Sequence, residues 1–138
     1  MDTRPLSLRR LDDAVPLLAE LPLSDRAALA AIARQTHAGT GDVLVRDGVF
    51  QYELIAIEVG EAELSRGGEC VQRLSEGDVF GEVGALERRV GNCTLVARTP
   101  MALITLSALD LRRLRRREPA TVARMQAALL RGRVPVAG

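Results

Sequence analysis

Residues 77–97 are the part of the sequence best suited to chemistry, because glycines there surround a carboxylate and precede a second polar stretch. The segment reads GDVFGEVGALERRVGNCTLVA. Gly81 and Gly84 flank Glu82 and Val83, which predicts a short helix whose first turn lets a ligand approach the backbone. Free N–H groups at a helix start attract anions, and a carboxylate accepts hydrogen bonds from sugar hydroxyls. The segment favours a site for a phosphate beside a ribose; the alternative is an ordinary glycine-rich turn with a solvated Glu82.

Helices at both ends and a glycine-punctuated middle must position that site. Residues 5–36 carry apolar side chains at roughly helical spacing, and we expect helices there. Residues 39–106 hold ten glycines that separate short runs rich in Val, Leu and Ile. This pattern predicts many short strands joined by tight turns, with a hairpin turn at residues 66–69. Closure of such strands into a roll would remove exposed strand edges.

Helical spacing returns over residues 107–132. Ser107 can cap the first of these helices, and Leu109, Leu111 and Leu114 are expected to point inward. Pro119 can open a second helix in its first turn. The sequence thus predicts one domain, residues 1–138, of a mainly β class with flanking helices.

Arginine is distributed unevenly. The chain has a formal net charge of +1, but residues 107–138 hold eight Arg against Asp110 and Glu118. Five of these lie in one run: Arg112, Arg113, Arg115, Arg116 and Arg117. One interpretation is a docking surface for an acidic partner, an anionic membrane or nucleic acid. The other is the solvated face of a helix.

Composition argues against several function classes. No run approaches the ~18 apolar residues of a membrane-spanning helix, and the amino-terminal residues lack an apolar signal core, so we expect a cytoplasmic protein. The two cysteines do not form a C-x-x-C pair, and His37 is the one histidine. We therefore expect no metal, no cofactor and no enzymatic activity, since neither a metal cluster nor a catalytic triad is apparent.

Residues 80–97 resemble the phosphate-binding cassette of the cyclic-nucleotide-binding domain family. That family includes the catabolite activator protein, the regulatory subunit of cyclic-AMP-dependent protein kinase and nucleotide-gated channels. Its cassette reads roughly F-G-E-[ILV]-[AG]-L, a short loop, then P-R-[ST]-A-T-[VL]. This chain has FGEVGAL and, at the usual distance, CTLVA; VPLLAEL, GDVL and IEVG match other family motifs in order. The resemblance covers about residues 8–132 and implies a jelly-roll-like β-roll with amino-terminal helices and carboxyl-terminal hinge and lid helices.

The resemblance also implies a ligand, cAMP or cGMP, and a set of residues that bind it. The phosphate and ribose would be held by Gly81, Glu82, Val83, Gly84, Asn92 and Cys93. Leu64 and Val71 are candidates for contact with the base, or else ordinary core residues. Cys93 stands where the family has Ala and is interpreted as a small buried residue.

The chain departs from the family at the charge that pairs with the cyclic phosphate. Gly91 stands at the position of the cassette Arg, and Asn92 follows where Ser or Thr is common. A charge-assisted hydrogen bond contributes about 1.5–3 kcal/mol. Its loss would weaken binding by roughly tenfold to a hundredfold. Arg89 is either a surrogate for that charge or a solvated loop residue.

Two hypotheses follow. The first is a ligand-gated regulatory domain, alone or as the sensor of a larger channel, transporter or enzyme. The second is a degenerate domain that no longer binds nucleotide and acts in protein interaction or as a homodimer. Only 32 residues follow Leu106, and the hinge and lid helices use them, so we expect no helix-turn-helix DNA-binding domain.

Overall fold

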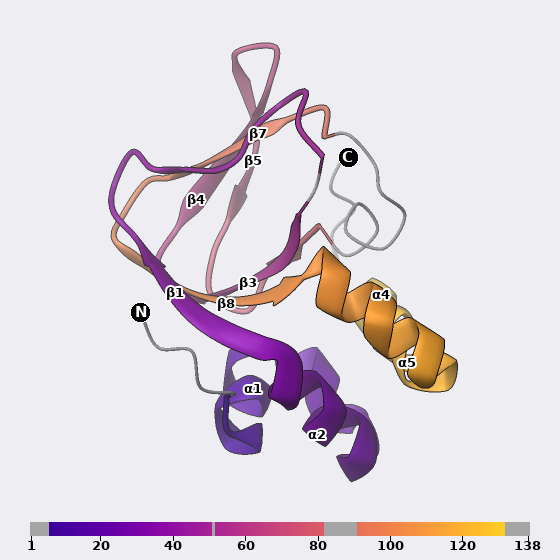
Figure 1. The fold of residues 1–138 in the computed structure, drawn as a ribbon. Coiled ribbons are helices and arrows are strands. Elements are labelled where there is room, and N and C mark those ends of the chain that lie inside the picture. The colour runs from indigo at the N-terminus through magenta and orange to yellow at the C-terminus, as the bar shows by residue number, and fades with distance from the viewer. Residues whose placement is uncertain (1–5, 51, 82–90, 132–138) are drawn as a thin grey trace.

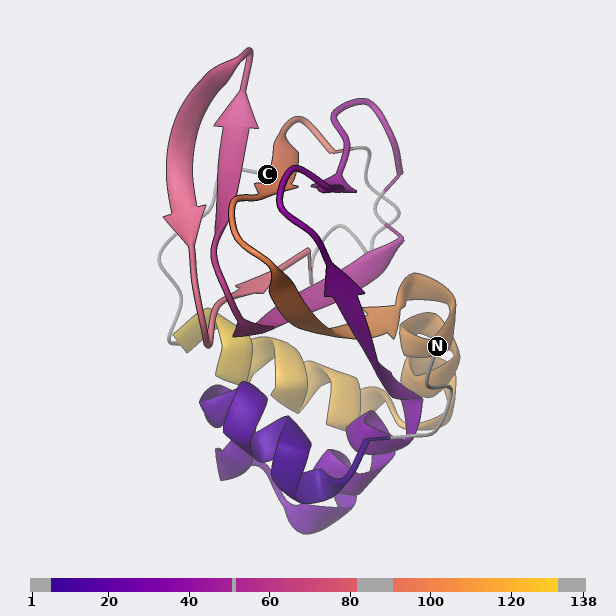
Figure 2. The same ribbon diagram turned by 90° about the vertical axis from the view of Figure 1, so that its left-hand side faces the viewer.

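Two antiparallel sheets form a roll, and helices cover the outer face of one of them (Figures 1 and 2). The computed structural model describes residues 6–50, 52–81 and 91–131. The helical elements are α1 (Leu8–Ala14), the 3-10 helix η1 (Pro16–Glu20), α2 (Leu23–Ile32), α4 (Ala108–Arg117) and α5 (Pro119–Arg131). The strands are β1 (Ala33–Ala38), β2 (Val43–Val45), β3 (Glu53–Val59), β4 (Ala62–Arg66), β5 (Glu69–Leu74), β6 (Val79–Phe80), β7 (Thr94–Ala97) and β8 (Met101–Ser107).

Each sheet has four strands. Sheet 1 has the order β1-β8-β3-β6, and sheet 2 has the order β2-β7-β4-β5. The predicted fold class, a β-roll with helices at both ends, is confirmed. The hairpin turn between β4 and β5 is also confirmed, because Gly67 and Gly68 have φ of 60° and 85° and the strands pair Arg66 with Glu69. Two successive positive φ angles favour glycine at both positions.

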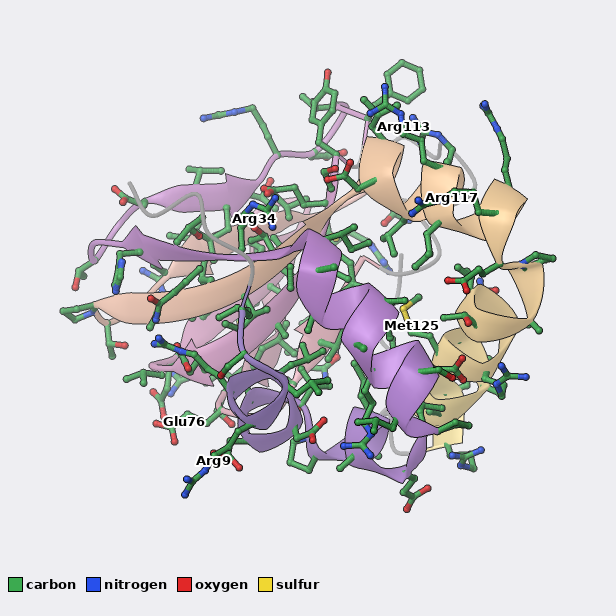
Figure 3. All side chains as sticks on the ribbon, turned by 60° about the horizontal axis from the view of Figure 1, so that its bottom comes forward. Arg9, Arg34, Glu76, Arg113, Arg117 and Met125 are labelled. Atoms are coloured by element: carbon green, nitrogen blue, oxygen red, sulfur yellow. The ribbon has the colours of Figure 1, made fainter. Side chains whose placement is uncertain are left out.

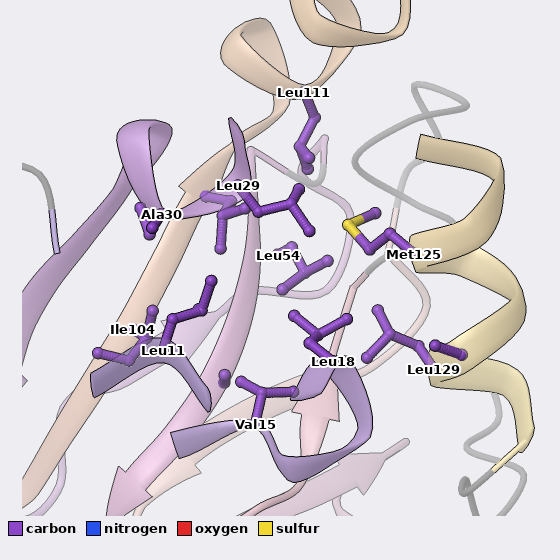
Figure 4. Packing of buried hydrophobic residues seen from close by; sticks show 14 of the residues in the cluster. Leu11, Val15, Leu18, Leu29, Ala30, Leu54, Ile104, Leu111, Met125 and Leu129 are labelled. Atoms are coloured by element: carbon purple, nitrogen blue, oxygen red, sulfur yellow. The ribbon is translucent and has the colours of Figure 1, made fainter. Parts of the chain in front are cut away.

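Sheet 1 separates two hydrophobic cores, because successive side chains of a strand point to opposite faces. Leu54 and Ile104 join side chains of α1, η1, α2, α4 and α5 in what we call the helical core (Figure 4). Ile55 and Leu103 face the other way and join the roll core between the two sheets. The runs ELIAIEV and MALITLS are almost continuously apolar for this reason: both faces of β3 and β8 are covered.

A buried carboxylate ties α5 to α2. Asp25 is 1% exposed and accepts a hydrogen bond from the Thr121 hydroxyl at 2.6 Å. It also accepts two hydrogen bonds from the Arg124 guanidinium, the one from Nη2 at 2.9 Å. These bonds hold the pKa of Asp25 below its usual value, with the Arg124 bond as the main cause and burial acting in the opposite direction. Carboxylate and guanidinium are therefore charged in the folded protein at neutral pH.

Two local expectations are wrong. Residues 33–36 were expected to be helical, but β1 begins at Ala33 and pairs with β8 along its whole length, Ala33 opposite Leu106. Leu109 was expected to point inward, but it is 51% exposed, whereas Leu111 and Leu114 are buried. The Ser107 cap is confirmed, because its hydroxyl accepts a hydrogen bond from the Asp110 amide at 3.1 Å. None of the helices that the structure describes combines the length and the hydropathy needed to span a bilayer.

Candidate functional site

The structure describes the two ends of the predicted site, and each end adjoins a short strand of a different sheet. β6 pairs with β3 in sheet 1, Phe80 opposite Ile55, and leads directly to Gly81. Gly81 has φ of 93°, a conformation that residues with a side chain rarely adopt. At the other end, residues 91–93 lead into β7 of sheet 2. The predicted site residues Glu82, Val83, Gly84 and Arg89 lie outside the described residues, and their roles stay predictions.

Gly91 is anchored by its backbone. Its N–H donates to the Val49 carbonyl at 3.0 Å, and its own carbonyl accepts from the Gly48 N–H at 2.9 Å. A Cβ built at Gly91 would lie 3.7 Å from the nearest neighbouring atom, an ordinary contact distance, and its φ lies outside the left-handed region. The backbone at position 91 therefore does not require glycine, and a Cβ there would make only ordinary contacts with the described residues.

Asn92 and Cys93 sit at the end of sheet 2 beside Arg66, the last residue of β4. The Arg66 guanidinium Nη2 donates to Asn92 Oδ1 at 3.4 Å. The side chain of Cys93 belongs to the roll core and is 1% exposed, so the prediction that it is a small buried residue is confirmed. Burial raises the pKa of the Cys93 thiol, the nearby Arg66 guanidinium opposes that shift, and the Asp47 carboxylate adds to it. The thiol is therefore protonated at neutral pH and unsuited to nucleophilic attack.

The two candidate base-contact residues are placed very differently. Leu64 is fully buried in the roll core, which agrees with its interpretation as a core residue. Val71 is 49% exposed, so its interpretation as a core residue is wrong. The cause is a bulge in the β4–β5 hairpin: Leu64 pairs with Gln72 and Ser65 with Cys70, which leaves Val71 without an opposite residue.

Two open cavities adjoin this end of the roll. A smaller one of about 200 Å³ includes Arg46 and Val49 in its lining, the two residues whose carbonyls face Gly91. A larger one of about 530 Å³ shares Arg46 and extends between the sheets past Ile55, Leu103 and Thr105. A volume of this size suits a small organic ligand. The lining of the larger cavity mixes apolar side chains with the charged residues Asp42, Arg46 and Glu53.

A profile of the family described as "Cyclic nucleotide-binding domain" matches residues 35–118 of the 138. The chain belongs to this family. The match begins within β1 and ends after α4, so it covers the roll and both described ends of the site. The predictions of family and fold are thereby confirmed, whereas the roles of individual site residues stay predictions.

Related proteins share both sequence and fold with this member of the cyclic nucleotide-binding domain family. A cAMP-dependent protein kinase regulatory subunit of Eremothecium gossypii is 35% identical over 102 residues, 73% of this chain and 22% of that protein. A cyclic nucleotide-binding domain from Methylobacillus flagellatus superposes with a TM-score of 0.78 at 16% identity, covering 92% of this chain and 78% of that one. The regulatory subunit of a cAMP-independent protein kinase A from Trypanosoma brucei gives 0.74 at 21% identity, covering 91% and 45%.

The two structural likenesses establish the fold alone. This chain spans between 22% and 29% of the length of the curated relatives it matches, so each of those relatives contains much more than this domain.

Arg66 is the residue of this region that the sequence-based reasoning missed. Residue 66 was predicted to begin the hairpin turn, but the structure extends β4 to Arg66, which therefore shares a face with Ala62 and Leu64 at alternate positions. Asp25 was also missed as a buried charge. Its partners lie 96 and 99 residues away, and no local pattern marks them.

Proposed function

We propose that this chain is a regulatory domain that binds a cyclic purine nucleotide, cAMP or cGMP, in its roll. The observation that carries the proposal is the family match over residues 35–118, which includes both Gly81 and the segment 91–93. Relatives described as cAMP-dependent protein kinase regulatory subunits make cAMP the first ligand to test. The proposed role is recognition without catalysis, and no cofactor other than this ligand is part of it.

In this proposal the cyclic phosphate lies against Asn92 and the backbone of Cys93. Gly81 lets the chain turn toward the ligand, and Glu82 accepts hydrogen bonds from the ribose. Val83 and Gly84 complete the phosphate and ribose contacts that the cassette pattern predicts. The base lies against the face of sheet 2 that points into the roll. The buried side chain of Leu64 packs beneath the residues that the base would contact.

The direct test is isothermal titration calorimetry of the purified chain with cAMP and with cGMP. A parallel titration of Gly91→Arg restores the charge that the family cassette carries. The variant should bind about tenfold more tightly or better, because a charge-assisted bond to phosphate contributes about 1.5–3 kcal/mol. The Cβ at position 91 has ordinary contacts, so the substitution should not disturb the fold.

Gly39→Arg is the matched control for that substitution. Gly39 also lies outside the left-handed region, its Cβ would meet only Asp42 at 3.8 Å, and it sits in the turn between β1 and β2. Both variants add one arginine, so a general effect of net charge would appear in both. Failure of both the wild-type chain and Gly91→Arg to bind either nucleotide, with folding verified by circular dichroism, would refute the proposed function.

The second candidate function is a degenerate domain used for protein interaction or dimerisation. Gly91 favours it, because the cassette position that carries a cation in the family is uncharged here. The surface it would use is the arginine-bearing side of α4, which includes Arg113 and Arg117 (Figure 3). No carboxylate in the described part of the chain forms an ion pair with either residue. Light scattering at increasing protein concentration tests a homodimer, and loss of association in Arg113→Glu would locate it on α4.

A larger parent protein and a cytoplasmic location complete the proposal. This chain covers only a small part of the length of its curated relatives, which supports a sensor domain within a longer channel, transporter or enzyme. Cys70 and Cys93 are both free thiols, and Cys70 is exposed. Free exposed thiols are typical of the reducing cytoplasm.

A further inference from the structure

Arg66 lies on the inner face of sheet 2 at the end of β4. Side chains alternate along a strand, and Ala62 and Leu64 both belong to the roll core. Glu63, on the opposite face, instead pairs with Arg98 at 2.9 Å. Arg66 therefore continues the inward-facing row, at the position where that row reaches the edge of the roll.

The strand register brings Arg66 beside Cys93. Ser65 of β4 pairs with Thr94 of β7, and continuing this antiparallel register by one residue sets Arg66 opposite Cys93. The guanidinium contact with Asn92 Oδ1 agrees with that placement. So does its influence on the Cys93 thiol, whose pKa it pulls downward against the effect of burial. The positive charge thus lies at residues 92–93, next to the glycine that replaces the cassette arginine.

The charge of Arg66 is not neutralised by an ion pair within the described residues. Arg98, the residue after β7, forms an ion pair with Glu63, whereas Arg66 contacts a neutral amide at 3.4 Å, a long hydrogen bond. An amide contact of this length is readily exchanged for a stronger one with an anion. The guanidinium is planar and can donate two parallel bonds to phosphate oxygens.

We propose that Arg66 supplies the phosphate-binding cation of this domain, in place of the arginine that is absent at position 91. On binding, its guanidinium exchanges Asn92 Oδ1 for an oxygen of the cyclic phosphate, and the Asn92 side-chain Nδ2 donates to the same phosphate. The proposal rests on the proposed function, since it concerns the same ligand. The proposal places the phosphate-binding charge on β4, the strand that pairs with β7, and not within the cassette segment itself.

The test compares Arg66→Ala with Arg73→Ala by calorimetry, using cAMP and the uncharged nucleoside adenosine as probes. Arg73 is an exposed arginine of β5 that lies opposite Glu63 in the hairpin. The substitution Arg73→Ala therefore removes the same charge as Arg66→Ala, but from the other face of sheet 2. Arg66→Ala should weaken cAMP binding by about tenfold to a hundredfold, from the value of a charge-assisted bond. Adenosine binding should be unchanged, because adenosine carries no phosphate. Arg73→Ala should leave both affinities within about twofold of wild type, as expected for a surface charge.

A double variant separates failure of this inference from failure of the proposed function. Adding Gly91→Arg to Arg66→Ala should restore cAMP affinity to the wild-type level or above it. Equal cAMP affinities for wild type, Arg66→Ala and Arg73→Ala would overturn the role of Arg66 while leaving nucleotide binding intact. Binding by Gly91→Arg without binding by wild type would also overturn it, because Arg66 would then fail to supply the charge. Loss of adenosine and cAMP binding together in Arg66→Ala would indicate a disturbed fold and would contradict the inference.

Discussion

Asp25 fixes α5 against α2, and its replacement by Ala should lower the free energy of unfolding by roughly 2–4 kcal/mol. The carboxylate is 1% exposed and accepts three hydrogen bonds, one from Thr121 and two from Arg124. A neutral bond contributes about 1 kcal/mol and a charged one about 1.5–3 kcal/mol. The Arg124 side chain is 48% exposed, so solvent weakens its electrostatic interaction with Asp25. We therefore take the free energy of the Arg124 bonds near the lower limit of that range. The Thr121 hydroxyl, 5% exposed, would also lose its partner.

Urea denaturation at pH 7 measures this free energy, and thermal unfolding should show a fall in Tm of about 6 to 20 °C for a domain of this size. The exposed Asp13 of α1 provides the control, because Asp13→Ala removes the same group from a solvated site. Unfolding of Asp25→Ala within about 0.5 kcal/mol of wild type would refute the reasoning, since it would mean that the buried bonds contribute nothing net.

The pH dependence gives a second, independent measure of Asp25. Its folded-state pKa lies below the value of about 3.9 for an unfolded chain. The stabilisation is therefore fully present above pH ~4 and is lost as the pH falls through the folded-state pKa. Asp25→Asn, which cannot ionise, should show a shallower loss of stability than wild type on acidification from pH 5 to pH 2. Parallel curves for the two proteins would contradict the assignment.

Two further predictions concern single residues in the roll. Gly60→Ala should lower the free energy of unfolding by about 1–3 kcal/mol in urea denaturation, because Gly60 has φ of 103° and a Cβ there would lie 2.6 Å from a backbone oxygen; a variant as stable as wild type would contradict the turn geometry. Of the two thiols, Cys70 should react with Ellman's reagent within seconds and Cys93 only after denaturation, because Cys70 is exposed while burial raises the pKa of Cys93; rapid release of two equivalents from the native chain would contradict it.

The roll was predictable from its turns, and its first strand was not. Gly67 and Gly68 occupy two positions with positive φ, so a glycine pair between apolar runs reliably indicates a hairpin. Residues 33–38 carry no comparable signal, because the helical spacing of α2 continues into them. Their strand conformation comes from pairing with β8, about 70 residues later in the chain. Tertiary pairing overrides local propensity at such a position.

The site was predictable only in part, for a similar reason. The glycine-flanked segment and the burial of Cys93 could be inferred from the cassette pattern. The exposure of Val71 depends on a bulge, which shifts the strand register without any local marker. The position of Arg66 beside Asn92 depends on which strand lies next to β7, and a single sequence does not specify strand order.

Sheet 1 separates the interior of the roll, where we propose that the nucleotide binds, from the helices on its outer face. Leu54 and Ile55 are consecutive residues, yet they pack into different cores. A tilt of β3 large enough to enlarge the roll core must therefore compress or loosen the packing against the helices. Hydrogen bonds from α5 to Asp25 join α5 to α2. Such a displacement would therefore move these two helices together, although they come from opposite ends of the sequence. Sheet 1 thus offers a route by which events inside the roll reach the helical surface without any contact between ligand and helix.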